Sequence, residues 1–271
     1  MINLVVLTAF IFVAYYQFAK RDKLAITNLT HANAVQWHDS LFKHLPKDMD
    51  TSIIVEDMHG TPLKFSQYIK PVFNHAAIIY HDKGTWKLHR TTKSAYDSLG
   101  TEDFAIARIP RAMAYRFTDT VKSWEQKLKA IAHTLAQADY VLAIKSQRKM
   151  FIQRKGKTIL TFNMNLGFKP VGNKVFEGDG KTPEGIYHLD NKHDRKDKFY
   201  KSFWISYPNS EDKATAKLKG VKTGLGIMIH GTNKANITTK DWTAGCIALQ
   251  NKDIDQLFDR VAPGTLIEIR K

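Results

Sequence analysis

Residues 229–258 read IHGTNKANITTKDWTAGCIALQNKDIDQLF and contain the only cysteine of the chain, Cys246. They begin inside an expected strand, residues 226–230 (GIMIH), whose last residue is His230. Cys246 follows His230 by sixteen residues and comes directly after Gly245. A histidine at a strand end and a cysteine behind a glycine are residue types that thiol chemistry uses.

A thiol has an ordinary pKa near 8.5, so it needs a base to become a thiolate at neutral pH. An imidazole can take the thiol proton and later return it to a leaving amine. The backbone carbonyl of Gly231 is close enough in sequence to orient the ring. Taken alone, however, a cysteine in the apolar run CIAL is typical of an inert core thiol. A histidine at a strand end is likewise typical of a hydrogen-bonded structural residue.

Three segments, in one order along the chain, resemble the L,D-transpeptidase catalytic (YkuD) family. Residues 229–258 are similar to its signature of a His, a gap of about fifteen residues, and Ser/Thr-His-Gly-Cys. Residues 177–187 (EGDGKTPEGIY) resemble the family's GDGKTPEG-Tyr segment. Residues 140–170 (YVLAIKSQRKMFIQRKGKTILTFNMNLGFKP) are similar to its leading β-hairpin. The resemblance covers residues 139–271 and implies a mainly β catalytic domain, a β-sandwich or barrel with short helices.

The resemblance also implies the roles of individual residues. Cys246 is the expected nucleophile, and His230 the general base and acid. The Gly231 carbonyl is expected to orient His230, and the N–H groups of Gly245 and Cys246 to form the oxyanion hole. Thr243 matches the family's Ser/Thr position and is expected to bind substrate. The implied chemistry needs no metal or organic cofactor.

The sequence departs from the family pattern at two positions. Ala244 replaces the usual His before Gly-Cys, and Ala248 replaces an Arg that often follows the Cys by two residues. Thiol chemistry is unaffected, but the acyl acceptor is left open. The form TAGCIAL resembles a sub-branch with enzymes that cleave wall crosslinks or release wall-attached lipoprotein. Three hypotheses follow: an L,D-transpeptidase acting on peptidoglycan, a related hydrolase, and a non-catalytic wall-binding module.

Residues 178–182 (GDGKT) look like the end of a phosphate-binding P-loop. Such a loop needs a glycine where Val175 stands, and Pro183 would block the helix that must follow it. We therefore expect a tight turn beside the active site instead. Lys181 and Glu184 in this segment are candidate substrate contacts.

The chain is expected to have four parts: an apolar helix (1–19), a small α+β domain (20–117), a connecting helix (118–138) and the catalytic domain (139–271). Residues 118–138 repeat apolar residues at spacings of three and four, as helices do. The expected strands are residues 52–56, 76–80, 86–90, 104–109, 140–144, 149–153, 158–163, 185–189, 203–207, 226–230 and 265–269.

A short helix is expected over residues 252–261, with Asn251 as its N-cap and the pair Pro263-Gly264 at its end. His75 and His89 lie in the α+β domain and could suggest a second site, but His75 is interpreted as a structural or exposed histidine.

Residues 4–19 (LVVLTAFIFVAYYQFA) carry no charge and are followed by Lys20, Arg21 and Lys23. They are interpreted as a retained export signal and anchor, with a cleaved signal and a buried helix as alternatives. The formal net charge of +15 favours polyanionic partners but does not choose among them. No nucleic-acid motif is present. The family resemblance implies peptidoglycan as the partner and the cell envelope as the location, and the N-terminal segment is expected to contact the membrane.

Overall fold

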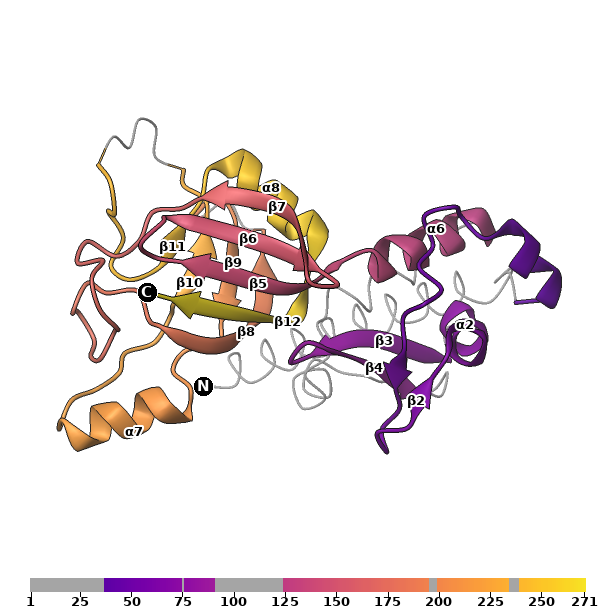
Figure 1. Cartoon of the computed structure of the whole chain (residues 1–271), viewed down its shortest axis with the longest axis horizontal. Helices are drawn as coiled ribbons and strands as arrows, with labels where there is room; N and C mark the ends of the chain where they lie inside the picture. The colour runs from indigo at the N-terminus through magenta and orange to yellow at the C-terminus, as the bar shows by residue number, and fades with distance from the viewer. Residues whose placement is uncertain (1–36, 75, 91–123, 195–198, 234–238) are drawn as a thin grey trace, which may run out of the picture.

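The computed structural model describes residues 37–74, 76–90, 124–194, 199–233 and 239–271. The expected apolar helix at 1–19, the expected strand at 104–109 and His75 lie outside these ranges. Among the described helices, none combines the length and the hydropathy that crossing a bilayer requires. Two units are present, one built on a four-stranded sheet and the other on an eight-stranded sheet (Figure 1).

The larger unit is mainly β, as expected for the catalytic domain. Its strands and helices are β5 (Ala138–Ile144), β6 (Lys149–Arg154), β7 (Lys157–Asn163), β8 (Gly185–His193), β9 (Ser202–Ile205), α7 (Ser210–Leu218), β10 (Met228–His230), β11 (Ile247–Ala248), α8 (Asn251–Arg260) and β12 (Val261–Arg270). The strand order across the sheet is β11-β10-β9-β8-β12-β5-β6-β7. Strand β12 therefore lies in the middle, parallel to β5 and antiparallel to β8.

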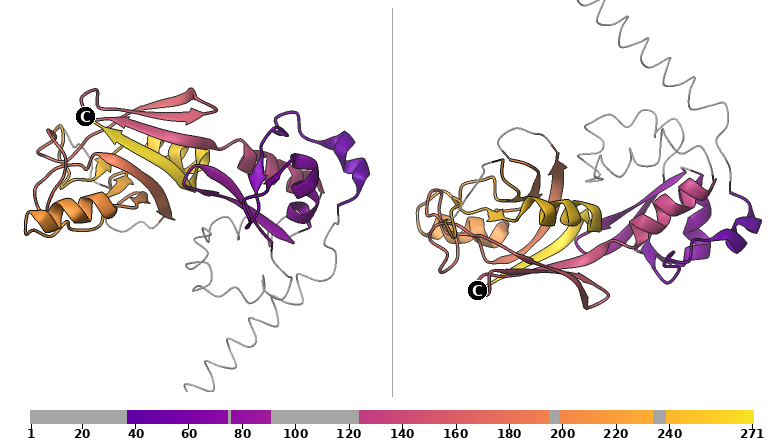
Figure 2. Two further views of the ribbon diagram at one scale, coloured as in Figure 1. Left: turned by 60° about the horizontal axis from the view of Figure 1, so that its bottom comes forward. Right: turned by 90° about the horizontal axis from the view of Figure 1, so that it is seen from above.

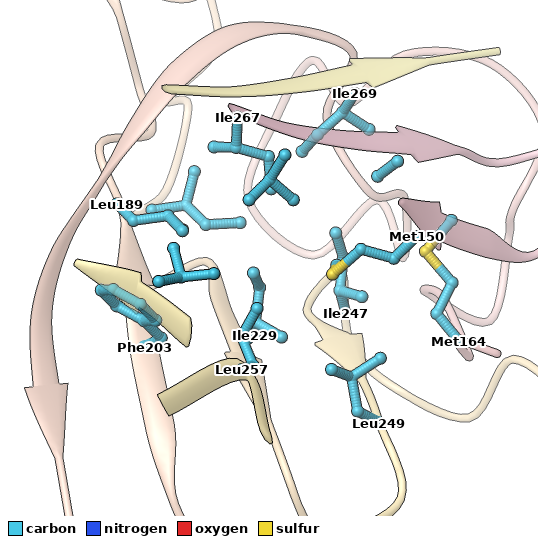
Figure 3. Packing of buried hydrophobic residues seen from close by; sticks show 14 of the residues in the cluster. Met150, Met164, Leu189, Phe203, Ile229, Ile247, Leu249, Leu257, Ile267 and Ile269 are labelled. Carbon is cyan, nitrogen blue, oxygen red and sulfur yellow. The ribbon is translucent and has the colours of Figure 1, made fainter. Parts of the chain in front are cut away.

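The sheet curls so that its two halves share one hydrophobic core. Figure 3 shows Met150 of β6 and Ile269 of β12 packed together with Ile229 of β10 and Leu257 of α8. These side chains are at most 1% exposed. Because both halves of one sheet contribute, the core is that of a sandwich closed by a continuous sheet.

The smaller unit combines β1 (Val55–Glu56), β2 (Pro62–Leu63), β3 (Ala77–Asp82) and β4 (Thr85–Arg90) with helices. Its helices are η1 (Asp39–His44), α2 (Phe65–Phe73) and α6 (Trp124–Leu135). Buried residues of α6, including Leu128 and Leu135, pack in the same core as Tyr68 of α2. The helix expected to connect the domains is thus part of the small unit's core, and the chain passes from it almost directly into β5.

The two units meet where the β3–β4 hairpin reaches β12 (Figure 2). Gly264 adopts φ +87°, and a Cβ there would lie 1.8 Å from the carbonyl oxygen of His81. A Cβ at Gly84, in the hairpin turn, would meet the Leu266 side chain at 2.8 Å. Glycine at both positions therefore lets the hairpin lie directly on β12.

Charged side chains add further links between the units. Asp50 pairs with Arg154 and with Lys155, whose Nζ lies 2.6 Å from the carboxylate. His133 of α6 lies 2.9 Å from the carboxylate of Asp259 in α8.

One sequence-based expectation near the C-terminus was wrong: Pro263-Gly264 does not end the helix. The helix ends at Arg260, and Pro263-Gly264 lies inside β12, where the pairing register shifts between Val261 and Leu266. This irregularity of β12 accommodates Pro263 and the positive φ of Gly264 within the strand. The Pro-Gly pair therefore marks a β-bulge in β12 and not the end of the helix. Helices α2 and α7 were not expected; α7 begins at a capping box formed by Asn209 and Asp212.

Candidate active site

His230 ends β10, and Cys246 is the residue directly before β11, the parallel neighbour of β10. In the β10–β11 ladder, Ile229 pairs with Ile247 and His230 pairs with Ala248. Side chains alternate along a strand, so Cys246, two residues before Ala248, lies on the same face as His230. The two isoleucines point to the opposite face, into the core.

The ring of His230 is buried and held in one orientation. Its Nδ1 lies 2.8 Å from the carbonyl oxygen of Gly231, the group that the sequence named to orient it; that orienting role stays a prediction. A carbonyl only accepts hydrogen bonds, so Nδ1 carries the proton and Nε2 of the neutral ring carries a lone pair. The Phe199 ring lies tilted against it with the ring centroids 4.1 Å apart, and Trp242 packs edge-on at 5.7 Å. The ring is therefore set up to accept a proton at Nε2.

Cys246 follows a turn that only glycine can make. Gly245 adopts φ +138°, and a Cβ there would lie 2.7 Å from the Lys181 carbonyl oxygen. Cys246 is half-buried, and its Sγ lies 3.6 Å from the Gly226 carbonyl oxygen.

Thr243 forms part of the same turn. Its hydroxyl donates to the Cys246 carbonyl at 2.7 Å and accepts from the Gly245 N–H at 3.1 Å. The side chain is 4% exposed, so in this structure it shapes the turn that carries the thiol. The Gly245 N–H, expected in an oxyanion hole, has Thr243 as its partner here. The part of Gly245 in catalysis therefore stays a prediction.

The GDGKT segment forms the expected turn beside Gly245 and is organised by Asp179. This buried carboxylate accepts from Lys174 Nζ at 2.9 Å and from the N–H groups of Val175, Phe176 and Lys181 at 2.7, 3.1 and 3.1 Å. Burial opposes its ionisation, but these donors outweigh burial and lower the pKa of Asp179. The Gly180 carbonyl then accepts from Lys169, on the strand-like segment beside the cysteine turn.

The two candidate substrate contacts have partners of their own. Glu184 lies 2.9 Å from Nζ of Lys145, a buried lysine that also donates to the Gly172 and Thr182 carbonyls at 2.7 and 2.8 Å. Burial lowers the pKa of Lys145, while Glu184 opposes this effect. Lys181 is half-buried, with its carbonyl oxygen against Gly245. Lys181 thus lies against the cysteine turn, and the contact of both residues with substrate stays a prediction.

The two departures from the family pattern fall in different surroundings. Ala244 is exposed beside Cys246, whereas Ala248 is buried and bridged through both backbone groups to Asn165. Position 244 is thus open to a ligand and position 248 is not.

Sequence reasoning missed an ion pair that holds the cysteine turn. Arg148, in the β5–β6 turn, binds Asp241 through Nε at 3.0 Å and Nη2 at 2.8 Å. Asp241 also accepts from the Leu166 N–H at 3.0 Å. These donors outweigh burial and lower the pKa of Asp241. The residues are far apart in sequence, and no local signal connected them. Among the described residues, no group of three or more His, Cys, Asp or Glu side chains could hold a metal ion.

The geometry can be compared with known proteins. Residues 138–269 match the family model described as the L,D-transpeptidase catalytic domain, YkuD. YafK of Escherichia coli K12, whose name proposes an L,D-transpeptidase activity, is 33% identical over 98 residues. That match covers 36% of this chain and 34% of YafK, so the chain aligns with about a third of its curated relative.

Two solved structures are similar over about half of the chain. One is the helical cell shape determining protein Pgp2 from Campylobacter jejuni, at 30% identity and a TM-score of 0.40; the match covers 49% of this chain and 48% of Pgp2. The other is Bd1075 from Bdellovibrio bacteriovorus, at 28% identity and a TM-score of 0.37, covering 48% and 46% of the two chains.

Proposed function

Because residues 138–269 carry the catalytic domain of the L,D-transpeptidase (YkuD) family, we propose that this protein is a cysteine-dependent L,D-transpeptidase acting on peptidoglycan stem peptides. The observation that carries the proposal is the bond from His230 Nδ1 to the Gly231 carbonyl at 2.8 Å. It leaves Nε2 as the proton acceptor on the face that Cys246 shares. A structural histidine would satisfy this bond equally, but it would not need a half-buried thiol on the same face.

In the first half-reaction, Nε2 of His230 takes the Cys246 proton, and the thiolate attacks the carbonyl carbon that links the third residue of the stem, a diamino acid, to a terminal D-residue. The carbon–sulfur bond forms, and the carbonyl π electrons move to oxygen. The carbon–nitrogen bond then breaks, the imidazolium gives its proton to the leaving amine, and a thioester remains on Cys246.

In the second half-reaction an amine of another stem attacks the thioester. Its proton passes to His230, the carbon–sulfur bond breaks, and the thiolate recovers the proton. The products are a new peptide bond and the original enzyme. The polar groups near the sulfur that stabilise the oxyanion include, in our proposal, the Cys246 N–H, with the Gly245 N–H joining if its bond to Thr243 is exchanged.

Hydrolysis is a second candidate, favoured by Ala244. Its methyl group offers neither a donor nor an acceptor to an incoming amine at an exposed position beside the thiol. Water would then resolve the thioester, and the protein would act as a carboxypeptidase or endopeptidase on wall crosslinks or on wall-attached lipoprotein.

Purified protein should be incubated with defined tetrapeptide muropeptides and with crosslinked dimers, and the products identified by mass spectrometry. Transpeptidation gives crosslinked products, whereas hydrolysis gives trimmed or split ones. Cys246→Ala should abolish every product, and Lys252→Ala, an exposed change on α8, serves as the matched control. Activity that persists in Cys246→Ala would eliminate the thiol mechanism.

A third candidate, a non-catalytic basic module that binds wall polymer, predicts a different result. Cys246 would then resist a carbapenem-type acylating agent at neutral pH in the folded protein. The same protein would still bind wall polymer. We propose a cell-envelope location for all three candidates, because peptidoglycan lies there and the run 4–19 is apolar. Cell fractionation with full-length protein tests it: recovery in the cytosolic fraction alone would refute it.

A further inference from the structure

Asn251 has a different position from the one expected of it. It was expected to cap α8, but the N-cap is Gln250 and Asn251 is the first helical residue. Its side chain leaves the helix and binds the backbone of Thr232 twice. Oδ1 accepts from the Thr232 N–H at 2.9 Å, and Nδ2 donates to the Thr232 carbonyl at 3.0 Å. The amide is therefore committed to the loop after His230.

The peptide group that Asn251 binds, between Gly231 and Thr232, is also the one whose carbonyl orients His230. The Thr232 N–H and the Gly231 carbonyl belong to the same planar peptide unit. Asn251 Oδ1 holds its N–H end, and the His230 Nδ1–H donates to its carbonyl end. A rotation of this plane would move the acceptor away from the ring, so the Asn251 side chain fixes the plane from the other side.

The remaining backbone groups around this peptide are held by main-chain partners. The Gly231 N–H donates to the Lys201 carbonyl at 3.0 Å, and the His230 carbonyl accepts from the Leu249 N–H at 2.9 Å. The space is also closed, since a Cβ on Gly231 would meet Asn251 Oδ1 at 2.5 Å. Asn251 therefore supplies a side-chain contact to a peptide whose neighbouring backbone groups are held by main-chain partners.

We propose that Asn251 is a positioning residue that locks the Gly231–Thr232 peptide and thereby keeps the proton of neutral His230 on Nδ1. An N–H that donates to an amide oxygen also polarises the carbonyl of its own peptide, which strengthens the bond from His230. The inference rests on the proposed function for its catalytic meaning, but the tautomer of His230 can be measured without any substrate.

The test uses three variants of the full chain. Asn251→Leu keeps the size of the side chain and removes both hydrogen bonds. Asn251→Asp keeps an oxygen for the Thr232 N–H, loses the donor to the Thr232 carbonyl and adds a negative charge. Lys252→Ala, on the next residue, is the exposed control. Nitrogen NMR on histidine-labelled protein reports the tautomer of His230, with His230→Gln identifying its signals. Iodoacetamide alkylation across pH reports the thiol, and the chain has only one cysteine to react.

Asn251→Leu should populate the Nε2–H tautomer and lower the alkylation rate at pH 7 roughly tenfold, the equivalent of about one hydrogen bond. Asn251→Asp should recover the tautomer and most of the rate, and Lys252→Ala should match the wild type. An unchanged tautomer and pH profile in Asn251→Leu would overturn the proposal. So would a lower melting temperature without any shift in tautomer, since that marks a purely structural role. The wild type and its variants can also give the expected tautomers and alkylation rates while the wild type leaves muropeptides unchanged. In that case the proposed function fails and the positioning role of Asn251 stands.

Discussion

Acidification from pH 7 to pH 5 should destabilise this protein through His81, a histidine of β3 at the junction with β12. The ring is 1% exposed and packs on Trp86 at 3.9 Å. Neither ring nitrogen has a hydrogen-bond partner within the described part of the chain. Burial lowers the pKa of His81 to about 4, from an ordinary 6.5. The folded protein therefore holds this ring neutral, while the unfolded chain lets it charge.

The direction and size of the effect follow from linkage. Because the folded pKa is depressed, the stability is fully present above pH 6.5 and is lost as the pH falls from 6.5 toward 4. With these two pKa values the loss is about 2 kcal/mol at pH 5 and about 3 kcal/mol at pH 4. A loss of 2 kcal/mol corresponds to a melting temperature lower by roughly 4–8 °C.

The assay is thermal unfolding of the wild type and of His81→Leu between pH 4 and pH 8. The variant should match or exceed the wild type at pH 7, because it replaces an unbonded polar ring by an apolar side chain. Its advantage should grow steadily below pH 6.5. His59→Gln, an exposed change in the same unit, should follow the wild type throughout. Parallel pH curves for wild type and His81→Leu would refute the reasoning, since the difference between them isolates this one group.

Three further predictions concern the catalytic loop and the junction. Asp179→Asn should lower the free energy of unfolding by about 3 kcal/mol, because it leaves the buried Lys174 ammonium without its anion. Denaturant titration measures this loss, and a change below about 0.5 kcal/mol would contradict the prediction. Gly245→Ala should abolish muropeptide turnover and lower the free energy of unfolding by about 2 kcal/mol. The alanine Cβ would clash with the Lys181 carbonyl oxygen, and the residue would keep a positive φ; wild-type turnover would contradict this. The pKa of Asp50 is lowered to about 2: burial opposes this shift, and the Lys155 and Ser52 hydrogen bonds outweigh it. Its stability contribution is thus present above pH 3.8 and lost as the pH falls from 3.8 through 2, so Asp50→Asn should remove about 1 kcal/mol at pH 7 and progressively less toward pH 2 in urea unfolding.

The strands were the part of the fold that sequence predicted well, because alternation of apolar and polar residues is local. The runs at 140–144, 149–153 and 158–163 correspond to β5, β6 and β7 within two residues at each end. Helix α2 was missed because Pro71 lies inside it and argues against a helix. Helix α7 had a readable signal, since Asn209 and Asp212 form a capping box.

The candidate site was predicted in part. His230, Gly231 and Cys246 were assigned from a family motif, which can be read from a sequence because its residues keep a fixed spacing. His230 and Gly231 are in contact in the structure. Asp241 and Asn251 could not be assigned, because their partners lie in other segments and a sequence carries no sign of which peptide a side chain will reach. Asn251 illustrates this directly: its residue type suits a helix cap equally well.

The central position of β12 has a consequence for how the catalytic sheet assembles. The strands β5 to β7 form hairpins among near neighbours, and β8 to β10 pair in sequence order. Among the named strands the two groups are joined through β12, which pairs with β5 and β8 from a much later point in the chain, while Asn165 adds an isolated bridge to Ala248. Pairing strands that are so far apart in sequence costs loop-closure entropy and is therefore slow. The two half-sheets should form first, with the strand edges that β12 later covers still unpaired. Refolding should therefore show a late phase that completes the core and the thiol site together, and the period before it is when the protein is most prone to aggregate.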